Sequence, residues 1–403
     1  MDKKEKKFCR LPSALPPEGL KVNQVPQLMS FAFDDNAYSG YKESGAVGGM
    51  KFIIDTFESF KNPAGKGNKE TFDDEPYKVT LYFKGNNAIK NDREDAALVK
   101  KIVNEAYKRG HEIGCHTFTH PEGVKFNWDT EPAQRIDNLF YDDWMKELTD
   151  CINLLTKPFN PNAASDDESA GMGIKREDIV GFRTPFLDYN EHVYKVLEDL
   201  GFKYDATIEE GWQDNMDGSD LLWPYTLDAG SPGDEYVAKT MYGRKEPFVK
   251  KHPGLWLLPE YVLIVPPDEL CEKYGTTKGA RARARDAAGD LDMASGKITG
   301  MDWNIWFQYF MNKEDALATM KYSFDLRYDG NRCPFTFGMH TDIYSDKYDI
   351  YDLEGDEKDH IKANAAQRRE AVIEFLEYIS KKPDCRVTTA ENVMKWLEKP
   401  VAL

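Results

Sequence analysis

Short apolar runs and amphipathic stretches follow one another along the chain. The first apolar run, residues 27–33 (QLMSFAF), has almost no polar position, as a strand buried on both faces requires. Comparable runs predict further strands at residues 78–83, 112–115, 179–183, 202–207, 255–258, 335–340 and 385–387. Segments suited to a buried sheet are therefore distributed along the chain from residue 27 to residue 387.

Between these runs the apolar residues recur at helical spacing. Residues 92–109 place their apolar positions on one face, and Asn91 with Glu94 predicts a capping box at the start of that helix. Asn190 predicts the start of another helix, which Gly201 closes. Strands that alternate with helices favour an α/β fold.

The bulk composition fits one large folded unit. The chain has 403 residues, of which 41% are hydrophobic and 13% aromatic, enough to fill a sizeable core. We find no linker, so we expect one domain over residues 1–403, with loop insertions near 61–77, 157–176 and 272–300.

Charge, hydropathy and cysteine spacing argue against nucleic-acid binding, a membrane span and a zinc finger. The net charge is −17, whereas a nucleic-acid-binding face has to be basic to neutralise phosphates. No apolar run is long enough to span a membrane, and the six cysteines form no CxxC pair that would indicate a zinc finger. We therefore expect no nucleic-acid partner and no membrane span, and the sequence leaves the oligomeric state open.

Polar side chains gather where the predicted strands end. Asp34 and Asp35 follow the first strand, His116 and His120 follow the third, and His340 ends a late one. Arg183 and Asp205 end or nearly end two others. In a (β/α) barrel the chemistry lies at these carboxyl ends, so we expect the seven side chains to meet there.

The spacing of His116 and His120 suits a metal ion. Two histidines four apart can face one direction, and a carboxylate would complete a three-ligand site with positions left for water and substrate. Taken alone, the pair also fits surface or core histidines, and the two aspartates also fit an ordinary polar turn.

The motifs together resemble the carbohydrate esterase family 4 polysaccharide deacetylases, which share the NodB-homology domain. The segments that carry the resemblance are Phe33-Asp34-Asp35, the run from Gly110 to His120, Arg183-Thr-Pro-Phe186, Tyr204-Asp205-Ala-Thr and Phe337-Gly-Met-His340. The residues around Trp256 are most similar to the chitin deacetylase branch that includes the arthropod enzymes. The resemblance implies a distorted (β/α) barrel with about seven strands.

The resemblance also implies a role for each residue. Asp35, His116 and His120 would hold one divalent metal ion, most simply Zn²⁺, with Co²⁺ or Mn²⁺ as alternatives. Asp34 would be the general base, held by Arg183, and His340 the general acid, kept protonated by Asp205. The backbone N–H of Phe186 would stabilise the oxyanion, and Trp256 would form a wall of the acetyl pocket.

The implied activity is metal-dependent removal of acetyl groups from an N-acetylglucosamine-containing polysaccharide or oligosaccharide. Two alternatives remain: O-deacetylation of a glycan such as acetylated xylan, and a non-catalytic glycan-binding protein on the same fold. The acetylated carbohydrate would be the partner. By resemblance we expect a secreted or periplasmic protein whose export signal is absent from this chain, with a cytoplasmic location as the alternative.

Overall fold

A computed structural model describes residues 8–89, 91–165, 167–353 and 357–403. The first seven residues of the charged segment 1–10 thus lie outside the described residues, as does residue 166 of the predicted insertion 157–176. No helix in the described ranges is long and apolar enough to cross a membrane.

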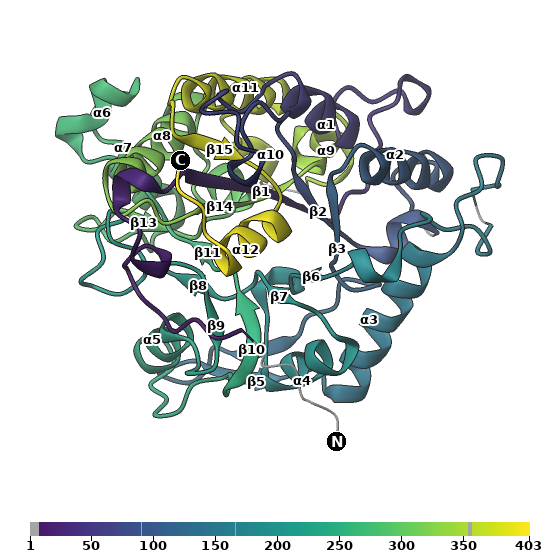
Figure 1. Ribbon diagram of the computed structural model, residues 1–403, viewed down its shortest axis with the longest axis horizontal. Helices are drawn as coiled ribbons and strands as arrows, with labels where there is room; N and C mark the ends of the chain where they lie inside the picture. The colour runs from purple at the N-terminus through teal and green to yellow at the C-terminus, as the bar shows by residue number, and fades with distance from the viewer. Residues whose placement is uncertain (1–7, 90, 166, 354–356) are drawn as a thin grey trace.

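Within these ranges the largest sheet has nine strands and curls into an open half-barrel (Figure 1). Seven neighbouring strands are parallel, in the order β14-β1-β2-β3-β6-β7-β10, which agrees with the predicted distorted barrel. An antiparallel strand, β9, adds to β10, and β15 pairs with the first residues of β1. The strands are β1 (Gln27–Asp34), β2 (Thr80–Phe83), β3 (Glu112–Cys115), β6 (Gly181–Phe182), β7 (Tyr204–Asp205), β9 (Tyr225–Leu227), β10 (His252–Leu257), β14 (Phe335–His340) and β15 (Cys385–Val387).

Strand β1 shows why the sheet is buried on both faces. All eight of its residues are buried. Met29, Phe31 and Phe33 belong to the main hydrophobic cluster, which the helices on the outer face complete. Leu28 and Ala32 point to the other face and belong to a second cluster rich in aromatic rings. Alternation along the strand therefore distributes one apolar run between two cores.

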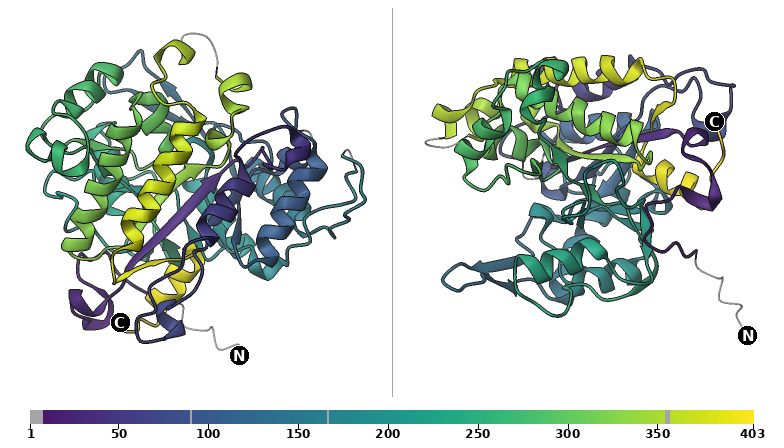
Figure 2. Two further views of the ribbon diagram at one scale, coloured as in Figure 1. Left: turned by 90° about the horizontal axis from the view of Figure 1, so that it is seen from above. Right: turned by 90° about the vertical axis from the view of Figure 1, so that its left-hand side faces the viewer.

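Helices cover the outer face of the sheet (Figures 1 and 2). Asn190 caps α4 through its side chain and Gly201 ends it in the left-handed region, as predicted. The other helix begins later than predicted, because Asp95 rather than Asn91 provides its cap. The α-helices are α1 (Met50–Glu58), α2 (Ala96–Lys108), α3 (Tyr141–Thr156), α4 (Glu191–Leu200), α5 (Pro232–Thr240), α6 (Asp268–Tyr274), α7 (Ala280–Ala288), α8 (Lys313–Asp329), α9 (Tyr348–Tyr351), α10 (Glu357–His360), α11 (Ala365–Ser380) and α12 (Ala390–Glu398).

One of the predicted loops contains a helix and a short strand. The insertion 272–300 carries α7 and the short strand β13 (Lys297–Ile298), which pairs with β12 (Leu263–Ile264). Two small pairings, β8 (Glu209–Glu210) with β11 (Glu260–Tyr261), and the hairpin β4 (Val124–Asn127) with β5 (Gln134–Asp137), had no clear signal in the sequence. The β8–β11 pair and the β4–β5 hairpin both contribute residues to the cavity described next.

The strand register brings the predicted chemistry to one edge. Asp34 pairs with His340 across β1 and β14, and Phe83 pairs with Cys115 across β2 and β3. His116, directly after Cys115, therefore lies on the same edge as Asp34 and His340, as expected for carboxyl ends of parallel strands.

Candidate metal centre and active site

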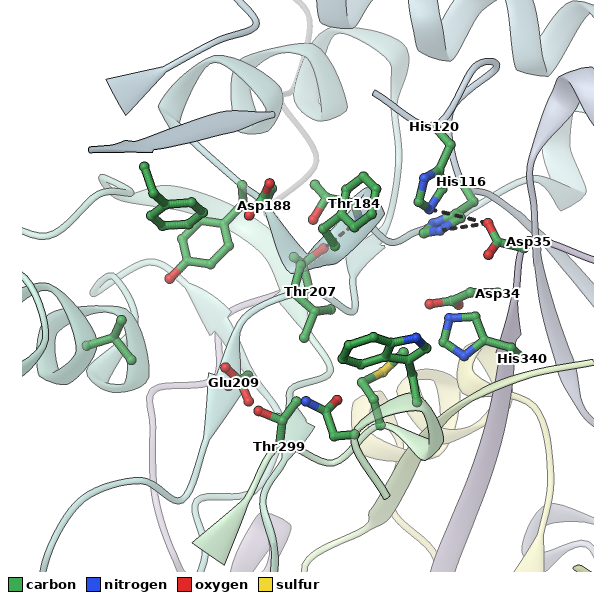
Figure 3. A pocket seen from close by; sticks show the side chains of 18 of the residues that line it. Asp34, Asp35, His116, His120, Thr184, Asp188, Thr207, Glu209, Thr299 and His340 are labelled. Carbon is green, nitrogen blue, oxygen red and sulfur yellow. Dashed lines mark hydrogen bonds and ion pairs between the residues drawn. The ribbon is translucent and has the colours of Figure 1, made fainter. Parts of the chain in front are cut away.

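Asp35, His116 and His120 form a compact group of possible metal ligands. One ligand atom from each lies within 4.8 Å of the other two. The Asp35 Oδ1 atom is 3.3 Å from His120 Nε2 and 3.8 Å from His116 Nε2, and the three side chains converge in Figure 3. The structure thus brings together the three residues expected to hold the ion.

The backbone at this group adopts an uncommon conformation. Asp35, Thr117 and His120 have φ values of 63°, 65° and 64°, a region that residues other than glycine rarely occupy. Such conformations persist only where the surroundings enforce them, and they concentrate at functional sites. The turn after β1 leaves Asp34 facing Arg183 while its neighbour Asp35 faces the histidines.

The protonation states of these three side chains suit the binding of a cation. Burial lowers the pKa of both His116 and His120 to about 4, so each imidazole is neutral at pH 7. Burial opposes ionisation of Asp35, but the positive charges of protonated His120 and His116, with those of His340 and Lys84, outweigh it and hold the pKa of Asp35 below its usual range. The buried Asp35 Oδ1 atom accepts no hydrogen bond, although buried oxygens normally do. One carboxylate and two neutral imidazoles therefore fit a divalent ion.

His116 is oriented by a second contact. Its Nδ1 atom lies 2.9 Å from the backbone carbonyl of Arg183, which can only accept, so the proton is on Nδ1. Nε2 is then left with its lone pair toward Asp35. Outer partners of this kind fix the tautomer of histidine ligands in metal proteins.

Asp34 lies under a buried arginine. The Arg183 guanidinium donates to Asp34 Oδ1 at 3.1 Å, to Glu260 Oε2 at 2.6 Å and to the Ala206 carbonyl at 2.8 Å. Burial outweighs Arg183 and raises the pKa of Asp34, and burial raises the pKa of Glu260 to about 8. Glu260 also accepts the N–H of Gly338, so it joins the arginine to strand β14.

His340 is paired with Asp302, not with Asp205 as the sequence predicted. The Asp302 Oδ1 atom is 2.7 Å from His340 Nδ1, and its other oxygen accepts the backbone N–H of His340. Burial disfavours the charged imidazole, but Asp302 raises the pKa of His340 to about 9. Asp205 instead accepts the hydroxyls of Tyr194 and Thr207. It ends β7 inside the protein and serves the local structure there.

One cavity of about 510 Å³ is lined by Asp34, Asp35, His116, His120 and His340 (Figure 3). Phe186, 62% exposed, forms part of its wall and packs its ring edge-on against His120 with centroids 4.5 Å apart. Trp256, which the sequence placed at the acetyl pocket, is buried in the second core and stacks on Phe8. Trp303, 42% exposed, is the tryptophan that lines the cavity, and it directly precedes the η8 turn (Asn304–Gln308).

Comparison with known sequences agrees with this geometry. Residues 50–162, which include His116 and His120, match the sequence profile of the family described as polysaccharide deacetylase. The segment that carries both histidines is therefore similar to the polysaccharide deacetylase family.

Family relatives are distant in sequence. The chain is 23% identical over 397 residues to chitin deacetylase 8 of Bombyx mori, a match that covers 98% of this chain and 76% of that protein. It is 27% identical over 225 residues to chitin deacetylase 1 of the same organism, covering 55% of this chain and 31% of that protein. A candidate polysaccharide deacetylase from Mycobacterium smegmatis has a crystal structure that aligns over 99% of this chain and 98% of its own, with 15% identity and a TM-score of 0.45.

Proposed function

We propose that this protein hydrolyses acetyl groups from a chitin-like glycan that contains N-acetylglucosamine, with one divalent metal ion, most simply Zn²⁺. The observation that carries the proposal is the arrangement of Asp34, His340 and the Asp35–His116–His120 group around a single cavity. The distant chitin deacetylase relatives support the substrate class.

The metal supplies Lewis-acid chemistry: when bound, it polarises the acetyl carbonyl and lowers the pKa of a nearby water. Asp34 takes the proton from the attacking water, and Arg183 holds its carboxylate in the geometry that this transfer needs. Burial raises the pKa of Asp34 above its usual range and so increases its basicity. The backbone N–H of Phe186 donates to the developing oxyanion of the substrate.

The leaving amine needs a proton when the carbon–nitrogen bond breaks. His340 supplies it, because Asp302 keeps the imidazolium populated at neutral pH. His340 is 17% exposed through the cavity, so its Nε2 edge can reach a bound substrate while Nδ1 remains on Asp302. The acid and the base thus lie on adjacent strands, β14 and β1.

The test is acetate release from chitin oligomers, colloidal chitin, peptidoglycan and acetylated xylan. Each substrate is assayed with the protein as purified, after chelation, and after Zn²⁺ is added back. We expect release from the N-acetylglucosamine substrates that chelation abolishes and Zn²⁺ restores. Acetate release from xylan alone would favour O-deacetylation over N-deacetylation. Acetate release that is unchanged after chelation would overturn the metal mechanism.

The variant Asp34→Asn separates catalysis from binding. It should retain bound metal, measured by elemental analysis, while turnover falls by about 100-fold or more, the usual contribution of a general base. The matched control is Asp286→Asn, an exposed aspartate on α7. Wild-type turnover in Asp34→Asn would remove the base from the mechanism, and binding without any turnover in the wild type would favour a glycan-binding protein.

A further inference from the structure

The carboxylate of Asp188 has no use in the chemistry above. Asp188 is 8% exposed and lines the cavity with its side chain (Figure 3). Within the described residues no donor forms a hydrogen bond or salt bridge with it. Burial raises its pKa to about 7, against the weaker influence of Arg135. Buried polar groups are normally hydrogen-bonded. A ligand that carries hydrogen-bond donors can therefore supply the partners that the Asp188 carboxylate lacks among the described residues.

Aromatic rings line the same part of the cavity. Phe126 on β4 and Tyr242 after α5 both contribute to the wall, and their planes differ by 24° with centroids 6.2 Å apart. Trp128 continues the row, stacked on Phe126 at 5.2 Å and 23°, and its side chain is 73% exposed. We call these three rings the aromatic row. Phe126 belongs to the β4–β5 hairpin, which projects from the body (Figure 2), and Trp128 directly follows β4.

The backbone places this region next to the metal centre. Asp188 follows Phe186 by two residues, so their Cα atoms are at most about 7 Å apart. The ring of Phe186 contacts His120. Asp188, Phe126 and Tyr242 thus line the same cavity as the metal centre, and Asp188 lies two residues from the ring that contacts His120.

We propose that Asp188, Phe126 and Tyr242 form a saccharide subsite that binds the pyranose residue next to the one being deacetylated. This inference rests on the proposed function and specifies its substrate as a chain of at least two sugar residues. At a pH above about 7, where Asp188 is mostly ionised, the hydroxyl groups of the neighbouring sugar donate to its carboxylate, and a charged acceptor makes strong hydrogen bonds. The apolar C–H face of the ring packs on the aromatic wall, as ligands do in aromatic-lined pockets.

Trp128 extends the surface beyond this subsite. Large exposed apolar side chains that continue from a cavity commonly mark a binding surface. A longer chain would therefore cover Trp128, whereas a dimer would leave it exposed. Affinity should rise from monomer to dimer through Asp188 and Phe126, and further with longer chains through Trp128.

The experiment measures binding without turnover. N-acetylglucosamine, its β-1,4-linked dimer and its tetramer are titrated by calorimetry into Zn²⁺-loaded Asp34→Asn protein, with or without a second substitution. Asp188→Asn keeps the shape but removes the charge, and should weaken tetramer binding by about tenfold, the loss of one charged hydrogen bond. The ratio of tetramer to monomer affinity should fall with it.

Further variants test the rings. Phe126→Ala should reduce the same ratio, and Trp128→Ala should weaken the tetramer while leaving the dimer unchanged. Ile136→Ala is the matched control, since Ile136 is 51% exposed on the same hairpin and does not line the cavity. Circular dichroism and zinc content verify that each variant is folded. If Phe126→Ala does not fold, Asp188→Asn still tests the subsite.

The outcomes separate this subsite from the proposed function. An affinity ratio that Asp188→Asn and the control leave equally unchanged overturns the subsite. Efficient deacetylation of monomer with no gain on longer chains also overturns it, while the proposed activity stands. Oligomer binding that depends on Asp188, in a wild-type protein that releases no acetate, supports the subsite and overturns the catalytic proposal.

Discussion

At the residue scale, the pair His340–Asp302 predicts a specific pH dependence. Asp302 raises the pKa of His340 to about 9, so the imidazolium that donates the proton is present below that pH and lost above it. Asp302→Asn removes the charge and should lower the pKa of His340 by about one unit or more. The alkaline limb of kcat/KM for acetate release should then move to lower pH by the same amount.

Tyr344 provides the control for this pair. Its hydroxyl donates to the same carboxylate, at 3.0 Å from Asp302 Oδ2. Tyr344→Phe removes that hydrogen bond and leaves the charge beside His340, so its alkaline limb should stay in place. If Asp302→Asn lowers the rate equally at every pH, the aspartate only shapes the site and does not set the protonation of His340.

The sequence predicted the residues that lie at strand ends better than their partners. Asp34, Asp35, His116, His120 and His340 each follow or end a strand, and the register of parallel strands brings them together. Asp302 and Glu260 gave no such signal, because Asp302 follows the predicted insertion 272–300 and Glu260 lies on a two-residue strand. The path of those loops decides which carboxylate contacts His340. The hydrophobic periodicity of the sequence does not determine that path.

At the element scale, strand β14 fits its neighbours only because residue 338 is glycine. A Cβ atom at Gly338 would lie 2.0 Å from Met301 Sδ and 2.9 Å from Glu260 Oε2. Gly338→Ala should therefore destabilise the protein by about 1–3 kcal/mol, as overpacking does. Urea unfolding measures the change.

The contact with Met301 makes this prediction sharper. Met301→Ala removes the closest atom, so the double variant Gly338→Ala/Met301→Ala should regain part of the loss that Gly338→Ala causes. A favourable coupling energy in the double-mutant cycle is the expected result. If the two changes simply add, Met301 is not the group that excludes a side chain at position 338.

Elements with strong periodicity were predicted close to their observed bounds. Strands β3 and β14 have the predicted limits, and α4 has the predicted caps. The β4–β5 hairpin was missed, because three of the four residues of β5 are exposed and no apolar face marks it. Helix α7 fell within a predicted loop because its sequence, ARARARDAA, has only two buried positions. Elements that bury little leave little pattern to detect.

At the scale of the whole molecule, segments far apart in sequence meet inside the curled sheet. Glu112 on β3 accepts hydrogen bonds from the Thr80 hydroxyl at 2.8 Å, the Tyr204 hydroxyl at 2.5 Å and the Glu391 N–H at 2.9 Å. These donors belong to β2, β7 and the start of α12. One carboxyl group therefore connects the early, middle and last parts of the chain. The hydrophobic pattern of the strands predicts that their residues are buried. It does not predict that β2, β7 and α12 meet at Glu112, because that depends on how the sheet curls.

This buried carboxyl predicts how the stability of the fold changes with pH. Burial raises the pKa of Glu112 from 4.5 to about 7, although its three hydrogen bonds oppose the shift. A raised pKa means that the folded state binds the proton more tightly, so the contribution is full below pH 4.5 and lost as pH rises through about 7. The shift corresponds to about 3 kcal/mol of unfolding free energy.

Glu112→Gln removes this titration while keeping the size of the side chain. The difference in unfolding free energy between wild type and variant, from urea titrations at several pH values, isolates Glu112 from other titrating groups. We expect the difference to shift by about 3 kcal/mol in favour of the variant between pH 4.5 and 8. A difference that is constant over this range would mean that Glu112 keeps an ordinary pKa, and that its three hydrogen bonds compensate fully for burial.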